Sequence, residues 1–578
     1  MKDQQRIVLF SLVSTIKKLF VIGLVFIFLN LLCSNLWSLT LKSQWGNKDN
    51  SHHLIDGVFV VWWNNSKDRS VEAKTILSEL NKVRDDVMNH FGMIDPPNIT
   101  NGNYINIYLH QGQGDTVFPV GNGVGTDQWG NPYMTIGSAD INNLDHEAFH
   151  LYQYNGVVRY RGDTGWYIES SANWYAAIRN KDYATRFIGA SSLVHHPQLP
   201  MWHSSFFNRE EGEKYNWGRA MHQYEMSTFL YYLTKFCHVS EEVIGGAFYK
   251  RTGFLPQKYL YEAIGKDKFR EYWLNFTAQL AGDYGFLTPD EARRSEEGWY
   301  RHMEGQNDDQ RYVKIMTNSG TEGQYIRPDW EHMPKGWSYN AFKIINSQNA
   351  TYTVSLEADK KGTNQTISNF NGKVVIFNHS KKKYYNFKML DLHHGEVRFD
   401  VNKNDNEIYI IVASMPESFS SNERYPYQIK IDRSIKSNFE HTLDCIKASY
   451  VYQNVCTWSK WTEMYKQCKT YQYPSLDDGF FATKVKKGLC NIENWYNLMI
   501  KLKFRQNPPN SLESSLLCVK HYADQNQCTW AHWSEMYSIC QTYDYKELDT
   551  DNFLLNQVID HKCTRDNWPK LIEDIFNH

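Results

Sequence analysis

Residues 144–153 read LDHEAFHLYQ, and residues 165–174 read GWYIESSANW. Apolar residues in the first stretch recur with helical spacing, and a helix over residues 141–154 places His146 and His150 four positions apart on one face. Two imidazoles in this arrangement can bind one metal ion. Glu147 is turned by about 100° around the same helix, so it lies beside the ion, where a general base that activates water belongs. The pattern therefore predicts a zinc site.

A catalytic zinc ion takes three protein ligands and keeps one position open for the reactive water. Glu169 is the candidate for the third ligand, because it lies 19 residues after His150 in a stretch that also has helical spacing. A short turn between two antiparallel helices would return it to the first helix. Asn173, one turn beyond Glu169, is predicted to accept the N–H of a ligand histidine and so to fix its tautomer.

The motif HEAFH, followed by a glutamate after 18 intervening residues, resembles the gluzincin zinc metallopeptidases, the thermolysin-like and aminopeptidase-like group. The resemblance covers about residues 55–285. The longer sequences HEAFHLYQ and WYIESSANW are similar to those of secreted gluzincin-like domains. It implies zinc (Zn²⁺) as the cofactor, His146, His150 and Glu169 as its ligands, and Glu147 as the catalytic acid and base. Many gluzincins carry aspartate four residues after the glutamate ligand, where this chain has Asn173.

Two other interpretations of the motif stay open at this point. In one, the two histidines lie on an ordinary helix surface, Glu169 belongs to the next helix, and no metal binds. In the other, the metal binds but the activity has been lost. The motif alone does not separate these interpretations from an active site, because His-Glu-x-x-His also arises by chance in a chain with 21 histidines.

A zinc peptidase also needs a hydrogen-bond donor for the oxyanion of the tetrahedral intermediate. His222 and Tyr224 are the candidates, within a long helical pattern over residues 217–233. Both side chains could instead only cap or pack that helix. The alternatives are Tyr215, His195 and His196.

Strands and one helix are predicted before the motif. Residues 57–63 and 104–109 read as strands, and residues 71–91 as an amphipathic helix. The Gly-rich residues 111–130 lack the ending of a phosphate-binding loop, so we expect a mobile loop near the cleft. Residues 131–137 read as a short edge strand, which in gluzincin-like enzymes holds the substrate backbone by strand addition.

The N-terminus carries a secretory signal. Residues 19–29 form an apolar run of 11 after Lys17 and Lys18, intermediate between the core of a signal peptide and a membrane-spanning helix. A cleaved signal peptide and an uncleaved signal anchor, with a lumenal or extracellular catalytic domain, both fit this segment. The whole chain of 578 residues has a formal net charge of −2, which does not favour binding to nucleic acid or to an anionic membrane.

Two further regions follow the predicted catalytic region. Six segments between residues 310 and 435 alternate apolar and polar residues, which predicts a β-sandwich that binds glycan or substrate or simply braces the enzyme. Residues 456–468 (CTWSKWTEMYKQC) then match residues 528–540 (CTWAHWSEMYSIC), which indicates a duplication. Each copy holds four cysteines and an aromatic helical pattern. We expect two disulfides in each copy, with three possible pairings, and not zinc binding, because the secretory signal predicts oxidation.

The sequence thus predicts an α+β multidomain chain that is a secreted or type II membrane-anchored zinc peptidase. The expected segments are a signal peptide or signal anchor at 1–38, a gluzincin-like domain at 55–285, a β-sandwich at 310–435, and mainly helical Cys-rich repeats at 440–505 and 512–578. Its partners would be a peptide or protein substrate and a glycan or cell-surface protein, with no nucleic acid, and it would meet the membrane only through the N-terminal segment. The main rivals are an extracellular binding protein that has lost peptidase activity and a structural extracellular protein without metal.

Overall fold

A computed structural model of the chain describes residues 39–153, 162–180, 191–204, 222–248, 255–281, 312–317, 323–378, 381–405 and 407–435, and parts of residues 438–542. The predicted signal segment at 1–38 and the alternative oxyanion donor Tyr215 lie outside these residues. The chain divides into two compact units, Met1–Arg433 and Ser434–His578, and each is described by itself. Among the described residues, no helix combines the length and the apolarity that crossing a bilayer requires.

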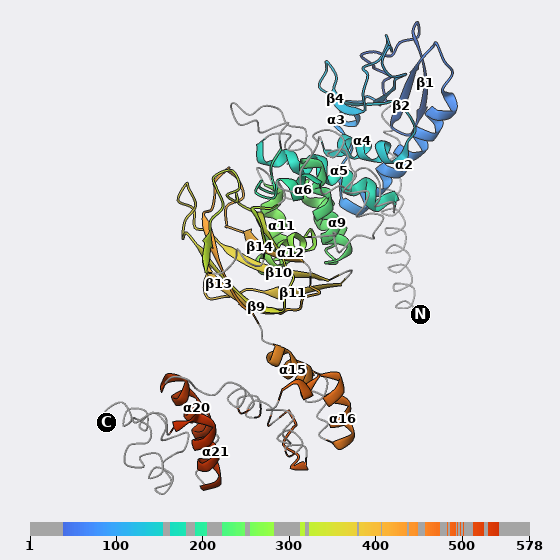
Figure 1. Cartoon of the computed structure of the whole chain (residues 1–578). Coiled ribbons are helices and arrows are strands. Elements are labelled where there is room, and N and C mark those ends of the chain that lie inside the picture. The colour runs from blue at the N-terminus through green and yellow to red at the C-terminus, as the bar shows by residue number, and fades with distance from the viewer. Residues whose placement is uncertain are drawn as a thin grey trace, which may run out of the picture. The chain divides into compact units, whose positions relative to one another are not determined.

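The first unit begins with a five-stranded sheet in the order β1-β2-β3-β5-β4 (Figure 1). Its strands are β1 (Ser51–Asp56), β2 (Phe59–Asn64), β3 (Ile105–Leu109), β4 (Gly123–Thr126) and β5 (Pro132–Ile136). The central strands β2, β3 and β5 run parallel, whereas β1 and β4 pair antiparallel at the two edges. Strands β2 and β3 are buried almost throughout, as expected for parallel strands covered on both faces.

Two predictions about this sheet are wrong. Strand β5 is not an edge strand, because β4 pairs along its outer side with Gly123 opposite Thr135. Strand β4 itself comes from the Gly-rich segment for which we predicted only a loop. Glycine is required within it, because a Cβ atom at Gly125 would lie 2.7 Å from the hydroxyl oxygen of Tyr133 on β5.

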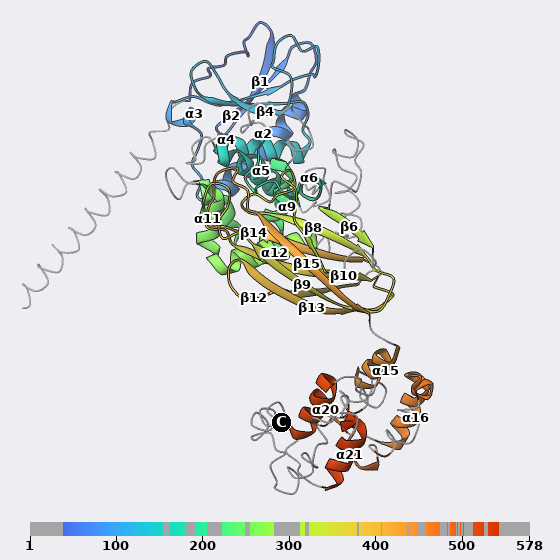
Figure 2. The same ribbon diagram turned by 60° about the vertical axis from the view of Figure 1, so that its left-hand side comes forward.

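Helices form a layer beneath this sheet (Figures 1 and 2). They are α2 (Ser70–Phe91), α3 (Pro97–Thr100), α4 (Ile141–Gln153), α5 (Gly165–Asn180), α6 (Ser191–His195), α8 (His222–Glu225), α9 (Ser227–Lys235), α10 (Glu241–Gly245), α11 (Pro256–Ile264) and α12 (Lys266–Gln279). The predicted helix over residues 71–91 is confirmed as α2, which ends at Gly92 in the left-handed conformation. In its described part, the helix predicted over residues 217–233 is divided at Met226 into α8 and α9.

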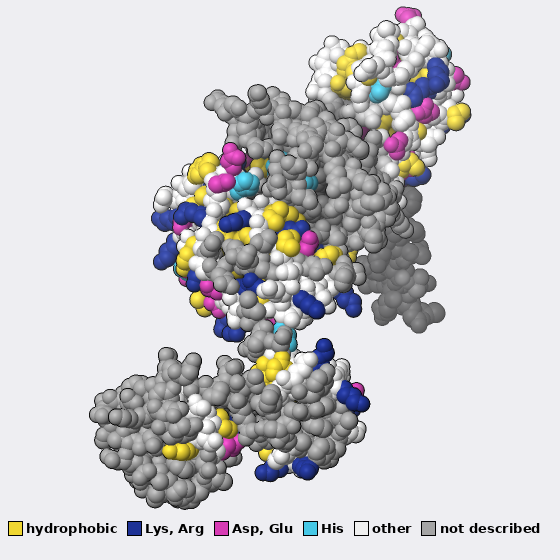
Figure 3. Space-filling view, in the orientation of Figure 1, with side chains coloured by type: hydrophobic (Ala, Val, Ile, Leu, Met, Phe, Trp, Pro, Cys, Tyr) yellow, Lys and Arg dark blue, Asp and Glu magenta, His cyan; other side chains and the backbone are white. Residues whose placement is uncertain are grey.

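The β-sandwich of the first unit consists of two five-stranded sheets. Their orders are β11-β10-β14-β8-β6 and β12-β13-β9-β15-β7. The strands are β6 (Lys314–Thr317), β7 (Gln324–Ile326), β8 (Ser338–Ile345), β9 (Ala350–Ala358), β10 (Phe370–Asn378), β11 (Lys381–Asn386), β12 (Lys388–Met389), β13 (His394–Val401), β14 (Glu407–Ser414) and β15 (Tyr427–Ile435). All six strands that the alternating pattern predicts are present. On the face shown in Figure 3, Lys and Arg side chains of the sandwich are scattered among acidic and apolar ones.

The helical layer and the sandwich share one buried core. Trp337 of the sandwich is fully buried, with its ring centroid 5.1 Å from that of Phe269 on α12. Gln257 of α11 accepts a hydrogen bond from Trp166 Nε1 on α5 and donates one to the carbonyl oxygen of Phe419. The sandwich therefore braces the helix α5 that carries Glu169.

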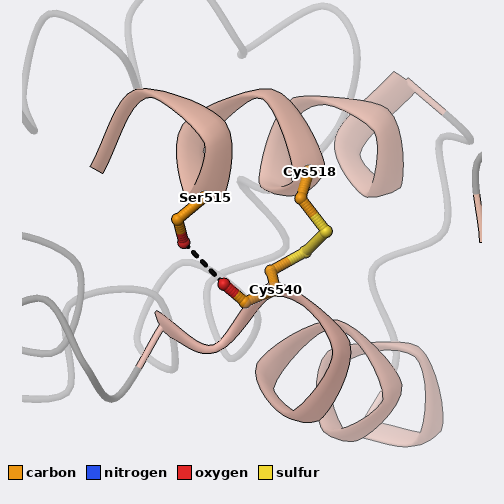
Figure 4. The surroundings of a disulfide bond; sticks show 3 residues. All are labelled: Ser515, Cys518 and Cys540. Atoms are coloured by element: carbon orange, nitrogen blue, oxygen red, sulfur yellow. Dashed lines mark hydrogen bonds between the residues drawn. A yellow bond between two sulfur atoms is a disulfide. The ribbon is translucent and has the colours of Figure 1, made fainter. Parts of the chain in front are cut away.

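The second unit contains two helix pairs of the same design. They are α15 (Asn438–Ile446) with α16 (Trp458–Gln467), and α20 (Leu512–Asp524) with α21 (Trp530–Cys540). The disulfides Cys445–Cys468 and Cys518–Cys540 close the two pairs, so the first cysteine of each copy pairs with the third. Figure 4 shows the second bridge, where Ser515 Oγ also donates a 2.7 Å hydrogen bond to the carbonyl oxygen of Cys540.

These bonds support the predicted duplication and indicate an oxidising compartment, extracellular or lumenal. Cys490 is disulfide-bonded as well. Of the aromatic side chains that mark the helical pattern of the repeats, the structure describes Tyr537, which is partly exposed on α21, and the others lie outside the part of the chain whose side chains it describes.

Candidate metal centre

Helices α4 and α5 pack against each other and bring the three predicted metal ligands together. The Nε2 atoms of His146 and His150 lie 3.0 Å apart, and Glu169 Oε2 lies 3.5 Å from the first and 3.4 Å from the second. All three side chains are largely buried, with at most 14% of their side-chain surface exposed. The helix predicted over residues 141–154 is thus present, and the chain between α4 and α5 returns Glu169 to its face.

The spacing of the three ligand atoms fits a tetrahedral ion. Bonds of about 2.0–2.1 Å from zinc to nitrogen and oxygen place neighbouring ligands of a tetrahedron about 3.3–3.4 Å apart. The three separations of 3.0, 3.4 and 3.5 Å scatter around that value. Two imidazoles and one carboxylate are also the donor set that suits zinc at a catalytic site with an open position. The residues present therefore fit the metal that the motif implies.

Glu147 lies next to this group without being needed as one of the three ligands. One ligand atom from each of His146, Glu147 and His150 lies within 4.8 Å of the others. Burial raises the pKa of the Glu147 carboxyl, and the negative charge of Glu169 adds to this effect, whereas the two imidazoles oppose it. A carboxyl group with a raised pKa is a better proton acceptor near neutral pH than an ordinary glutamate.

Gln153 orients His150, a contact that the sequence analysis does not predict. Its Oε1 atom lies 2.6 Å from His150 Nδ1, and its Nε2 atom donates to the carbonyl oxygen of Ile168 and to Ser171 Oγ, both at 3.1 Å. The amide is thereby held so that its oxygen faces the imidazole, which leaves His150 Nε2 directed at the ligand group. Asn173 Nδ2 donates to the carbonyl oxygen of Tyr224, at 3.3 Å. The contact between Gln153 and His150 could have been predicted from the sequence, because Gln153 lies three residues after His150 on the same helix and residues at that spacing are neighbours on the helix surface.

The protonation of the ligands in the metal-free site is set by their mutual contacts. Burial acts to lower the pKa of His150, but the carboxylates of Glu169 and Glu147 outweigh it and raise the pKa to about 9. Burial acts to raise the pKa of Glu169, but the two imidazoles outweigh it and lower the pKa to about 2. The metal-free site therefore holds an ionised carboxylate and a protonated His150 at neutral pH.

Arg179, near the end of α5, links the two ligand helices to each other and to α2. Its Nε atom donates a 3.0 Å hydrogen bond to Asp145 Oδ2 on α4, directly before the ligand His146. The same guanidinium pairs with Glu79 and with Asp86 of α2, the latter at 3.6 Å. Because Asp145 is fully buried, its burial raises the pKa of that carboxyl to about 7 even beside Arg179. The sequence alone does not indicate this network, because its members lie on three separate helices.

The proposed oxyanion donors His222 and Tyr224 lie on α8, which packs against α5. His222 is 3% exposed, and burial lowers its pKa to about 3, so the imidazole is neutral at pH 7. Its ring centroid lies 5.8 Å from that of His203. Tyr224 is partly exposed. The alternative donors His195 and His196 lie at the end of α6, which also contacts α8.

Comparison with known proteins does not identify a family. No protein-family model matches the chain, and no curated protein matches it. Among solved structures, the pre-peptidase C-terminal domain of a collagenase from Bacillus anthracis matches 20% of this chain and 94% of that domain, with 9% sequence identity. The TM-score of this match is 0.14, which establishes no common fold.

Proposed function

We propose that this protein is a zinc-dependent peptidase whose metal ligands are His146, His150 and Glu169. The observation that carries the proposal is the convergence of three ligand atoms from two helices within 3.5 Å of one another, at tetrahedral spacing. The gluzincin resemblance of the motif supports the same assignment. A bound zinc ion would supply a water of lowered pKa and a positive charge that polarises the scissile carbonyl.

Glu147 is the general base and acid of this proposal. It lies beside the ligands in a buried site, and that burial raises its pKa. It would take a proton from the attacking water and later return the proton to the leaving amine, as a general acid–base group does. The neutral His222 and the hydroxyl of Tyr224 remain the candidates for donating a hydrogen bond to the oxyanion.

Strand β4 is the proposed substrate-binding edge, in place of β5. Within the described residues, no strand pairs with its outer side. It also contacts α4, the helix that carries the two histidines. An extended peptide that pairs with this edge would run alongside the metal site. The disulfides of the second unit fit an enzyme that acts outside the cytosol, either secreted or anchored by the segment at 1–38.

The test is a peptide-cleavage screen of the purified chain with and without a zinc chelator. We expect cleavage that the chelator abolishes and zinc restores. Glu147→Gln should keep the metal and lose activity by about 10²–10⁴-fold, because general acid–base catalysis contributes that much. The matched control is Glu262→Gln on α11, which leaves the metal site intact. Cleavage that survives both Glu147→Gln and the chelator would refute the proposal, and metal binding without any cleavage would favour a binding protein that has lost its activity.

A further inference from the structure

A second candidate site lies between α12 and the sandwich, where a cavity of about 500 Å³ opens. One wall is a face of α12 that carries Arg270, Glu271 and Asn275; Glu271 and Asn275 are four residues apart and so lie on the same side of the helix. The other wall is formed by residues on and next to β10 and β11, among them Asn369 and Asn386. Figures 1 and 2 show α12 lying along the sheet that contains these strands.

Polar contacts hold the two walls together beside the cavity. Lys373 Nζ on β10 donates a hydrogen bond to Asn275 Oδ1 on α12. Lys382 Nζ on β11 donates to the carbonyl oxygen of Ala281 at 2.8 Å, and the Tyr384 hydroxyl donates to Gln279 Oε1 at 3.0 Å. The helix and the sheet are therefore fixed around the cavity before any ligand enters.

Several polar groups that line the cavity keep hydrogen-bonding capacity for a ligand. Across the described residues, the side chains of Asn369, Asn386 and Glu271 make no hydrogen bond within the protein, whereas the Arg270 guanidinium already pairs with Glu417 and Asp267. Two amides and a carboxylate together offer both donors and acceptors.

Apolar side chains also line the cavity, and the charges of its lining balance. Leu274, Phe387 and Met415 line it and are 6%, 5% and 1% exposed. The cationic side chains in the wall, Arg270 and Lys373, are matched by the carboxylates Asp267 and Glu271. A balanced wall favours a neutral ligand over an anion or a cation, since a net charge would meet repulsion on one side.

We propose that this cavity binds a neutral saccharide of one or two rings. Sugar hydroxyls both donate and accept hydrogen bonds, which suits the amides of Asn369 and Asn386 and the carboxylate of Glu271. The C–H face of a sugar ring can lie against the apolar side chains of the lining. The volume falls within the range of about 300–1,000 Å³ that is typical of small-molecule sites. The proposal is independent of the peptidase activity, because none of these residues belongs to the metal site.

The experiment measures binding of four neutral disaccharides, chitobiose, cellobiose, lactose and maltose, to the purified full chain by saturation-transfer NMR and calorimetry. We expect saturable binding of at least one of them. Glu271→Ala and Asn386→Ala should each weaken that binding about tenfold or more, because each removes hydrogen bonds to the ligand. Asn364→Ala is the matched control, an exposed asparagine of the same sandwich outside the cavity lining.

Each outcome bears on the proposal. Thermal unfolding confirms that each variant is folded, and Asn369→Ala replaces either one that is not. Glu147→Gln should bind the disaccharide as the wild type does, which separates this site from the peptidase. The proposal is overturned if none of the four binds, if binding is unchanged in both cavity variants, or if only a charged sugar such as N-acetylneuraminic acid binds.

Discussion

Zinc binding at the candidate centre should release one proton at neutral pH, and replacing Glu169 should reduce that release. In the metal-free protein, Glu169 Oε2 lies 3.4 Å from His150 Nε2. Burial acts to lower the pKa of His150, but Glu169 and Glu147 raise it to about 9. Zinc binds only the unprotonated imidazole, so at pH 7 the proton must leave first.

The size of this effect follows from the pKa. Displacing the proton at pH 7 from a group of pKa 9 costs about 2.7 kcal/mol, because each unit corresponds to about 1.36 kcal/mol. Zinc affinity should therefore rise about tenfold from pH 7 to pH 8. Glu169 has a pKa of about 2, so it is ionised throughout this range and contributes nothing to the change.

Titration calorimetry of the metal-free protein measures both quantities. Zinc is titrated at pH 7 in two buffers of different ionisation enthalpy, and the difference in heat gives the number of protons released. We expect about one proton for the wild type and for Glu262→Gln, and weaker binding with less proton release for Glu169→Gln, which removes the charge that raises the His150 pKa. An affinity that is unchanged between pH 7 and pH 8, or equal proton release by Glu169→Gln, would refute this reasoning.

Three further changes test the surroundings of the site and the second unit. Gln153→Leu removes the acceptor at His150 Nδ1 and should weaken zinc binding about 10–100-fold in a chelator competition, and an unchanged affinity would show that Gln153 does not orient His150. Phe149→Ala removes a fully buried ring that stacks on Tyr175 at 4.6 Å and should lower the free energy of unfolding by about 3–5 kcal/mol in chemical denaturation, whereas a loss below about 1 kcal/mol would contradict the packing described. Replacing Cys518 and Cys540 together by serine should destabilise the second unit by about 2–4 kcal/mol and leave zinc binding intact, and altered zinc binding would show that the two units are coupled.

The local parts of the site were predictable from the sequence. The i, i+4 spacing of His146 and His150 and the surrounding apolar residues depend only on one helix, which forms over Ile141–Gln153. The six predicted strands of the sandwich have the same kind of local signal. Strand β4 was not predictable in this way, because two of the four residues in its sequence, GVGT, are glycine, which is unfavourable in strands. Its pairing with β5 is a tertiary contact that no local pattern indicates.

Other features depend on contacts between distant segments. Arg179 joins α5 to α2 and α4, and no periodicity in the sequence indicates such a contact. The cavity beside α12 combines a helix face with strands that follow about 100 residues later, so only the folded chain brings its polar groups together. The prediction that Asn173 accepts from a ligand histidine rests on helical spacing alone, and the structure adds that its amide nitrogen donates to the Tyr224 carbonyl.

The most direct test of the account is the metal content of the purified chain, measured by mass spectrometry after dialysis against zinc and then against metal-free buffer. We expect about one zinc ion per chain in the wild type and almost none in a folded His146→Ala and His150→Ala double variant, because two of the three ligands are gone. A wild-type chain that retains no zinc, or a double variant that retains as much as the wild type, would contradict the assignment of the metal centre.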